Sequence, residues 1–211
     1  MSDDRHPSDG RSRRAQETRE ARRAQILESA LQVFSERGYH GASVSDLVAA
    51  AGVARGTFYL YFDSKDAVFR ELLDELLQHL RSNVVGVDMS AGARPFEEQL
   101  VETVERILRT VENNRALTRI IFREAVGLDA TVDARMHAFY GSLAGFIGSA
   151  LELGARLGVV RALDVDVVAT CILGSLRGVV ERYVVDTEDP LDVERVARVV
   201  VAHNLHGLAP T

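Results

Sequence analysis

The sequence predicts an all-α protein, and three observations carry that prediction. Proline is scarce, with four residues among 211. Alternation of apolar and polar residues with the period of a strand is rare, whereas apolar residues recur three and four positions apart, as they do along one face of a helix. The composition, with 46% hydrophobic and 27% charged residues, is typical of a globular protein with its own core. We therefore expect about nine helices arranged in two parts.

The first eighteen residues and the helix after them have different patterns. Residues 1–18 are polar and rich in arginine without helical periodicity, so we expect a mobile N-terminal arm. A first helix is predicted over residues 19–37, in which Ile26 and Phe34 belong to an apolar stripe with a spacing of four. Gly38 is expected to end this helix, because glycine readily adopts the left-handed conformation found after many helices.

The most informative segment is SVSDLVAAAGVARGTFYLYFDSK, residues 43–65. Ser43 suits the N-cap of a short helix, and Asp46 stands where its carboxylate can reach back to the cap. Gly52 supplies a turn with positive φ at no steric cost. Another short helix is predicted over residues 54–61. This is the spacing of a helix-turn-helix, which places its second helix in the major groove of DNA.

The helix predicted over residues 54–61 has two faces with different roles. Phe58 and Phe62 lie four positions apart and are expected to anchor the inner face against the first helix. The outer face is then expected to meet DNA through five residues, Arg55, Gly56, Thr57, Tyr59 and Tyr61.

Each residue of this outer face suits a different contact with DNA. The guanidinium of Arg55 can donate to O6 and N7 of guanine, and the methyl group of Thr57 can meet a thymine methyl. Gly56 permits close approach of the backbone. The hydroxyls of Tyr59 and Tyr61 suit hydrogen bonds to phosphates, which set the position on DNA.

The stretch GTFYLYFDSKDAVF, preceded by ILESALQVFSERGYHGASVSDLVAAAGV, resembles the TetR/AcrR family of bacterial transcriptional regulators over about residues 24–75. The resemblance implies that Ser43 and Lys65 contact phosphates at the starts of their helices. It also implies that the side chains facing DNA are Arg55, Thr57, Tyr59 and Tyr61. The sequence departs from the common family pattern at Ala54, where a serine often caps the helix, and at Leu60, where an aromatic residue is frequent.

The distribution of charge fits a DNA-binding N-terminal part on an acidic body. The net charge is −6, yet residues 11–66 carry nine basic and seven acidic side chains, a local charge of +2. Lys65 is the only lysine, because the other 24 of the 25 basic residues are arginines. The arm arginines either reach the minor groove or nearby phosphates, or form a solvated face with Glu17 and Glu20; they are Arg13, Arg14, Arg19, Arg22 and Arg23.

The rest of the chain is predicted to continue as helices. Asp63 or Ser64 caps a fourth helix with a wide face of leucines. Residues 83–94, with glycines and a following proline, form the clearest interruption in the chain. Further helices are predicted over residues 95–113, 115–126, 131–157, 164–186 and 190–206. The last is expected to begin at Asp189-Pro190, with proline in its first turn.

The domain division follows from these elements and from the resemblance. Residues 19–66 are expected to form the helix-turn-helix domain, and residues 67–211 are implied to form a ligand-binding and dimerisation domain. Ten apolar or aromatic side chains are the candidates to line a pocket for a small, fairly apolar effector: Leu76, Ile107, Ile121, Phe122, Val126, Met136, Phe139, Tyr140, Leu143 and Phe146.

The resemblance also implies that the last two helices form a four-helix interface between two copies of the chain. The candidate interface residues are Leu173, Leu176, Arg177, Val180, Val193, Val196 and Val200. The stretch VVATCILGSLRGVV, residues 167–180, is apolar nearly all round, so it suits either such an interface or the centre of a monomeric core.

Other classes of function have little support in the sequence. Cys171 is the only cysteine, which excludes an intrachain disulfide and a cysteine-rich zinc site. His203 and His206 lie three apart without a further ligand nearby, so no metal is expected. Neither a GxSxG motif nor a phosphate-binding loop is present, so we expect no enzyme and no cofactor. No apolar run approaches the length of a membrane span, and the N-terminus lacks the pattern of a signal peptide, which predicts a cytoplasmic protein.

The sequence therefore predicts a homodimeric, one-component transcriptional regulator. We expect it to repress from a palindromic operator and to be released by a small effector. The alternative is a helical protein that binds a small molecule or a partner and whose DNA-binding part is not functional. The polar outer face of residues 55–61 discriminates between the two, since such a protein has no need of it.

Overall fold

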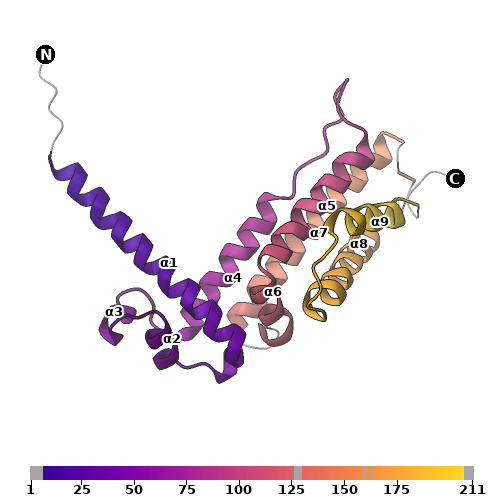
Figure 1. The fold of residues 1–211 in the computed structure, drawn as a ribbon. Helices are drawn as coiled ribbons and strands as arrows, with labels where there is room; N and C mark the ends of the chain where they lie inside the picture. The colour runs from indigo at the N-terminus through magenta and orange to yellow at the C-terminus, as the bar shows by residue number, and fades with distance from the viewer. Residues whose placement is uncertain (1–6, 126–129, 159, 162, 207–211) are drawn as a thin grey trace, which may run out of the picture. The chain divides into compact units, whose positions relative to one another are not determined.

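The computed structural model describes residues 7–125, 130–158, 160–161 and 163–206. These residues form nine α-helices and two π-helical turns joined by loops, which confirms the predicted all-α class. Figure 1 shows the arrangement of the helices along the chain. The elements are α1 (Pro7–Gly41), α2 (Val44–Ala50), α3 (Arg55–Tyr59), α4 (Lys65–Ser82), α5 (Phe96–Asn113), α6 (Arg115–Ile120), η1 (Ile121–Ala125), α7 (Ala130–Arg156), α8 (Val165–Val180), η2 (Glu181–Val185) and α9 (Val193–His206). The chain divides into two compact units, Met1–Leu72 and Leu73–Thr211, and the division falls within α4.

Helix α1 begins earlier than the sequence predicts. It starts at Pro7, so much of the segment expected to be an irregular arm is helical. Proline suits a first helical turn, where its missing N–H costs no hydrogen bond. Pairs four residues apart then support the exposed helix, including Arg13 with Glu17 at 3.4 Å. Polar residues can form a solvated helix without an apolar stripe, and the absence of such a stripe was therefore a misleading signal.

The end of α1 confirms the predicted role of Gly38. This residue has φ 73° and ψ 161°, which interrupts the helix before its last few residues. Immediately beyond the interruption, the ring of Tyr39 packs between Phe34 and Phe69, with centroids 5.4 Å and 4.9 Å away. The break in α1 thus places an aromatic side chain in the core of the first unit.

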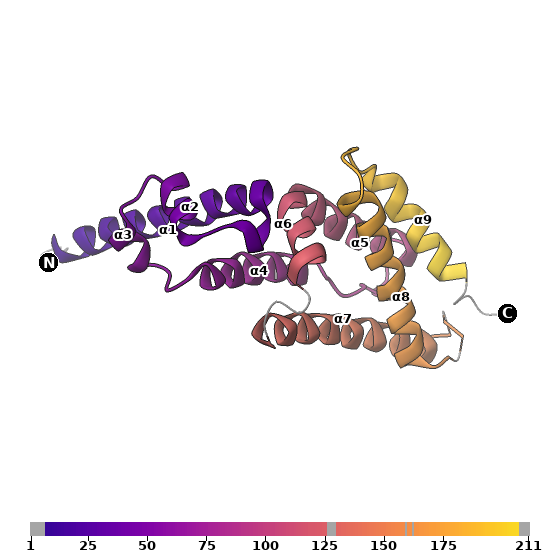
Figure 2. The ribbon, with the colours of Figure 1, turned by 90° about the horizontal axis from the view of Figure 1, so that it is seen from below.

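In the second unit, α5 packs against α9 and α7 packs against α8 (Figure 2). One apolar cluster joins Leu108 of α5 to Val196 and Ala197 of α9. A second cluster joins Leu151 of α7 to Ala169 of α8. The helical spacing of apolar residues in the sequence therefore corresponds to buried faces, as predicted.

The start of α9 differs from the prediction. The helix begins at Val193, where the carboxylate of Asp192 accepts from the backbone N–H of Arg195 at 3.1 Å, rather than at Asp189-Pro190. The residues before it are held in a loop, because Arg115 donates to the carbonyls of Thr187 and Asp189. These contacts come from a distant helix, so a local cap signal could not reveal them.

The segment between α4 and α5 is an ordered loop of the second unit. The side chain of Gln99 donates to the carbonyls of Asp88 and Arg94 at 2.9 Å and 2.7 Å, and it accepts from the backbone N–H of Asp88 at 2.8 Å. The interruption predicted at residues 83–94 is therefore present, but the boundary between the two units lies earlier, within α4.

Candidate DNA-binding surface and effector cavity

The short helix α2 is fixed by the predicted capping box. The hydroxyl of Ser43 accepts from the N–H of Asp46 at 3.3 Å, and the carboxylate of Asp46 accepts from the N–H of Ser43 at 2.9 Å. The hydroxyl of Ser43 also donates to the carboxylate of Asp46 at 2.6 Å, and this bond, the bond from the Ser43 N–H and the charge of Arg37 lower the pKa of Asp46 below its usual value. Gly52 follows α2 with φ 60°, as predicted for the turn. Local interactions thus set the entry to α3.

Helix α3 has the two faces expected from its sequence. Phe58 and Phe62 are buried, with exposed fractions of 0% and 3%. On the opposite side Arg55, Gly56 and Tyr59 are exposed, while Thr57 and Tyr61 are half-buried. A Cβ atom added at Gly56 would meet no atom within 4 Å, so the fold itself leaves this position open. The outer face is therefore available to a large partner.

The side chain of Arg55 lies across this outer face. One of its terminal nitrogens donates to the hydroxyl of Ser45 at 3.3 Å, and the other donates to the hydroxyl of Tyr59 at 3.5 Å. Its guanidinium carbon is 5.8 Å from the centre of the Tyr59 ring. These weak contacts between exposed groups orient the guanidinium, and they are easily exchanged for bonds to a base or phosphate.

Lys65 has a structural role that the sequence did not reveal. Its ammonium group donates to the carbonyls of Tyr39 and Ala42, each at 2.9 Å, and lies 4.6 Å from the centre of the Tyr39 ring. An ammonium group has three N–H donors, so one remains for a phosphate. The lysine joins the first turn of α4 to the chain that leads from α1 into α2.

Leu60 directly follows α3 and is the most exposed of the large hydrophobic side chains described, at 73%. The sequence marked this position only as a departure from the family pattern. In the structure it adds an apolar side chain beside the polar face of α3, suited to contact with a thymine methyl group.

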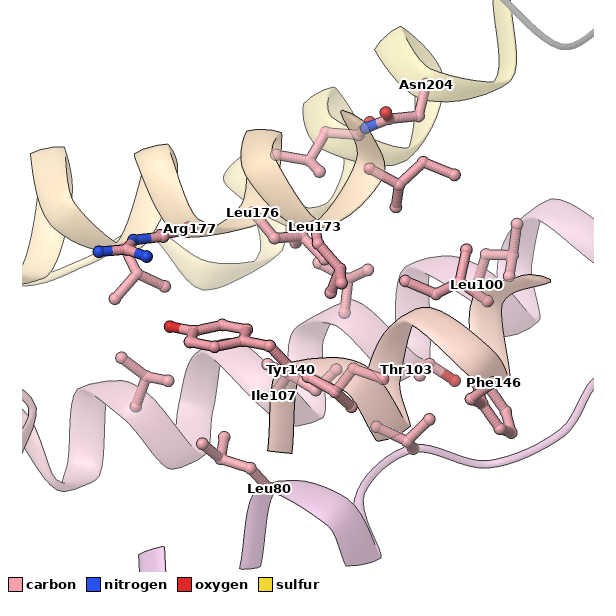
Figure 3. Close-up of a pocket in the computed structure, with 18 of the residues that line it drawn as sticks. Leu80, Leu100, Thr103, Ile107, Tyr140, Phe146, Leu173, Leu176, Arg177 and Asn204 are labelled. Atoms are coloured by element: carbon pink, nitrogen blue, oxygen red, sulfur yellow. The ribbon is translucent and has the colours of Figure 1, made fainter. Parts of the chain in front are cut away.

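The second unit contains a cavity of about 260 Å³. Figure 3 shows side chains converging on it from several helices. The structure brings together nine of the ten side chains predicted for an effector pocket, namely Leu76, Ile107, Ile121, Phe122, Met136, Phe139, Tyr140, Leu143 and Phe146. Val126, the tenth, lies outside the described residues.

The cavity also has a wall that the prediction placed elsewhere. Leu173, Leu176, Arg177, Val180 and Val200 were assigned to a dimer interface, but all five line the cavity. Further lining residues, such as Leu100, Thr103 and Asn204, carried no separate signal in the sequence (Figure 3). Helical periodicity identifies an inward-facing residue, but it does not show whether that residue borders a cavity or a filled core.

Four of the predicted interface residues face the core of the second unit, and the interface itself stays a prediction. Val180, Val193, Val196 and Val200 are buried within the second unit, in the cluster that contains Leu108. An apolar helix gives little indication of which side faces its own core, and the prediction chose the inner side. The hydrophobic or small residues exposed on α8 and α9 are instead Val167, Cys171, Gly174, Gly178 and Val199.

Arg177 gives the apolar cavity a positive charge. Its guanidinium carbon lies 5.6 Å from the centre of the Phe122 ring and 5.7 Å from the centre of the Tyr140 ring. Burial raises the pKa of the Tyr140 hydroxyl, and the charge of Arg177 opposes part of this rise. The phenol therefore remains protonated near neutral pH and is able to donate a hydrogen bond.

Metal-binding clusters and membrane-spanning helices are both absent from the described residues. Within residues 7–125, 130–158, 160–161 and 163–206, no group of three or more His, Cys, Asp or Glu side chains could hold a metal ion. In that same part of the chain, none of the helices is long and apolar enough to span a membrane.

Two segments of the chain match families of known proteins. Residues 26–72 match the family described as bacterial regulatory proteins, tetR family. Residues 93–208 match the tetracyclin repressor-like C-terminal domain. The first segment contains the helix-turn-helix and the second contains most of the elements that surround the cavity, so the two matches agree with the two units.

Similar proteins extend over nearly the whole chain. The HTH-type transcriptional regulator YdgC of Bacillus subtilis is 28% identical over 192 residues, covering 89% of this chain and 93% of its own. The HTH-type transcriptional repressor DhaR of a Mycobacterium species is 27% identical, covering 81% of this chain and 86% of its own. The structure of the fatty acid degradation regulator FadR from Bacillus halodurans superposes with a TM-score of 0.69 at 27% identity, covering 89% of this chain and 96% of its own. With family matches over both of its parts, the chain belongs to the TetR family of helix-turn-helix transcriptional regulators.

Proposed function

We propose that this regulator is a homodimeric repressor that binds a palindromic operator and is released by a small, largely apolar effector. The observation that carries the proposal is the presence, in one chain, of an exposed polar face on α3 and an apolar cavity in the second unit. The first suits contact with DNA, and the second suits a ligand that can regulate that contact.

For DNA, we assign base contacts to the exposed face of α3. Arg55 would donate to a guanine, while Thr57 and Leu60 would contact thymine methyl groups. The hydroxyls of Tyr59 and Tyr61 would bind phosphates and thereby set the position of α3 in the major groove. Ser43 would donate its hydroxyl to a further phosphate in exchange for the carboxylate of Asp46, to which this hydroxyl donates at 2.6 Å. Lys65 would add another phosphate contact.

For dimerisation, we propose the outward face of α8 in place of the buried residues predicted from the sequence. Val167 is 57% exposed, and Cβ atoms added at Gly174 or Gly178 would meet no atom within 4 Å. A second copy related by a twofold axis would cover this face with the same face of its own α8. Two recognition helices would then bind successive major grooves, which explains the palindrome.

For the effector, the cavity favours an apolar molecule, because most of its lining side chains are aliphatic or aromatic. FadR is described as a regulator of fatty acid degradation and DhaR as a repressor, which supports an apolar effector and a repressor role for this chain. Helix α4 contains residues of both units, so a bound effector that moved this helix would also shift α3. Such coupling requires that the effector bind the DNA-binding and the released conformations of the protein with different affinities, typically by about 1–3 kcal/mol.

The proposal can be tested by selecting random duplex DNA with the purified protein and titrating salt on the selected sequence. A palindrome with half-sites about one helical turn apart, and steep salt dependence, would support a dimeric operator-binding protein. Recovery of no sequence, with only weak salt-sensitive binding, would favour the alternative of a helical protein that binds a small molecule or a partner and whose DNA-binding part is not functional. Deletion of residues 1–18 in the same assay tests the arginines at the start of α1, since an unchanged salt slope would exclude them from the phosphate contacts.

A further inference from the structure

One lining residue of the cavity, Arg177, carries a positive charge. Among the described residues, Arg177 forms no ion pair with an Asp or Glu side chain. Two other arginines of the same unit have such a partner, since Arg115 pairs with Glu112 at 2.7 Å and Arg135 pairs with Asp74 at 2.8 Å. A guanidinium stacked on aromatic rings keeps its N–H donors free at its edge, where a planar oxyanion can accept two parallel hydrogen bonds.

The other polar groups of the cavity are mostly occupied by the protein. The hydroxyl of Thr103 donates to the carbonyl of Gln99 at 3.0 Å. The amide nitrogen of Asn204 donates to the hydroxyl of Ser175 at 3.2 Å. The hydroxyl of Tyr140, by contrast, has no hydrogen bond within the described part of the chain, and it belongs to a ring that Arg177 overlies. Arg177 and Tyr140 are therefore adjacent donors whose hydrogen bonds are not taken by a side-chain acceptor among the described residues.

These two donors lie at one end of the cavity. In Figure 3, Arg177 and Tyr140 stand at one end of the lining side chains and Phe146 stands at the other, with Leu173 and Ile107 between them. Arg177 is exposed, so a charged group bound to it would keep contact with water and avoid the full cost of desolvation. The lining of the cavity is therefore polar at the end with Arg177 and Tyr140 and apolar along the rest of its length.

We propose that the effector is an amphipathic anion, a carboxylate with a medium-length alkyl chain, bound through Arg177 and Tyr140. Its carboxylate accepts hydrogen bonds from the guanidinium and the phenol, and its chain lies against the aliphatic wall toward Phe146. The inference rests on the proposed function, because it names the chemical class of the effector. The volume of about 260 Å³ limits the ligand to a small one, since typical ligand pockets measure about 300–1,000 Å³.

Calorimetric titration of the full-length protein with three probes of equal chain length tests the head group. Decanoate is the anion, decanol is its neutral counterpart, and decyltrimethylammonium is the cation. We expect decanoate to bind about 10- to 100-fold more tightly than decanol, as hydrogen bonds to charged groups allow, and the cation to bind most weakly. Octanoate and dodecanoate would define the length of chain that the cavity accepts.

Variants connect this preference to the two donors. Arg177→Met should reduce the affinity for decanoate to that for decanol and leave the affinity for decanol unchanged. Arg177→Lys should restore part of the preference for decanoate over decanol. Tyr140→Phe should lower the affinity for decanoate by a smaller factor than Arg177→Met does. Arg182→Met is the matched control, because Arg182 is an exposed arginine of η2 that does not line the cavity. Its titration should match that of the unmodified protein.

The outcomes separate this inference from the proposed function. Equal binding of decanoate and decanol, or an unchanged preference in Arg177→Met, would overturn the assignment of an anion. If decanol then also released the operator, the proposed function would stand with a neutral effector. Arg177-dependent binding of decanoate without any effect on operator binding would support the site and contradict its regulatory use. Binding of none of the three probes would overturn the anion site.

Discussion

The residues expected to bind DNA and those that line the cavity differ in their distance along the chain. In the first unit, the outer face of α3, Ser43 and Lys65 all fall within residues 43–65. In the second unit, the cavity takes side chains from Leu76 in α4 to Leu205 in α9. A short segment with capping residues and a turn glycine largely specifies its own geometry. A cavity depends on the packing of several helices, and no short motif encodes it.

This difference explains why a family resemblance identifies DNA binding but not the effector. The shape of a helix-turn-helix is constrained by the major groove, which is the same for every regulator of this kind. A cavity wall is changed by substitution of any one of many scattered side chains, and each change alters the ligand that fits. The first unit should therefore respond sharply to single substitutions in its short motif. In the second unit, ligand binding should respond to changes in the polar groups that line the cavity or in the volume of the cavity.

The largest expected effect is on the stability of the first unit. Phe58→Ala removes a ring with no exposed surface and should destabilise the folded protein by about 3–5 kcal/mol. Urea unfolding followed by circular dichroism measures this loss. Phe146→Ala is the matched comparison in the second unit, where the ring is 37% exposed and borders a cavity, and it should cost clearly less. Equal losses would contradict the contrast between a filled core and a cavity wall.

The next effect is on recognition of DNA. Arg55→Ala should lower affinity for the preferred operator by about 1–3 kcal/mol and remove the preference at one base position. Competition binding with operators that vary at each position measures both changes. Arg94→Ala, at an exposed arginine of the loop before α5, should leave the base preferences intact. Retention of every base preference in Arg55→Ala would remove Arg55 from direct contact with bases.

Lys65 should show two effects that the structure separates. Lys65→Ala leaves the carbonyls of Tyr39 and Ala42 without their donor and should destabilise the protein by about 1–3 kcal/mol. A phosphate contact predicts in addition weaker binding to all DNA sequences and a salt slope reduced by about one. Unfolding and salt titration measure the two quantities independently. A loss of stability with an unchanged slope would leave Lys65 with its structural role alone.

The smallest expected effect concerns acid stability. The lowered pKa of Asp46 means that its interactions stabilise the folded state fully above the usual value of 3.8. This contribution should disappear as pH falls through the lower value of the folded state. Asp46→Asn should reduce the acid dependence of the urea midpoint, since an amide does not titrate there. An identical dependence in both proteins would show that the capping box does not contribute to acid unfolding.

The sequence predicted local features well and long-range ones poorly. Gly38, Gly52 and the capping box at Ser43 depend on a few neighbouring residues, and the structure confirms them. The start of α9 depends on Arg115, which is distant in the chain, and its prediction was wrong. The hydrogen bonds from Lys65 to Tyr39 and Ala42 likewise join residues that are distant in the chain, so the sequence did not predict them.

The candidate cavity shows the same division. Inward positions of single helices could be predicted from periodicity, and nine of ten candidates meet around one space. The side of α8 that faces this space could not be predicted, because apolar residues occur nearly all round that helix. Arg177 was consequently assigned to a surface between two copies, whereas it lies against Phe122 and Tyr140.

The central claim is that the cavity of the second unit controls the affinity of the first unit for DNA. Fluorescence anisotropy of a labelled operator, titrated with protein in the presence and absence of decanoate, tests it most directly. We expect decanoate to lower the affinity of the protein for the operator about 5- to 150-fold. We expect no such change in Ile107→Trp, because its larger side chain fills the cavity. An operator affinity that is the same with and without bound decanoate would contradict the account.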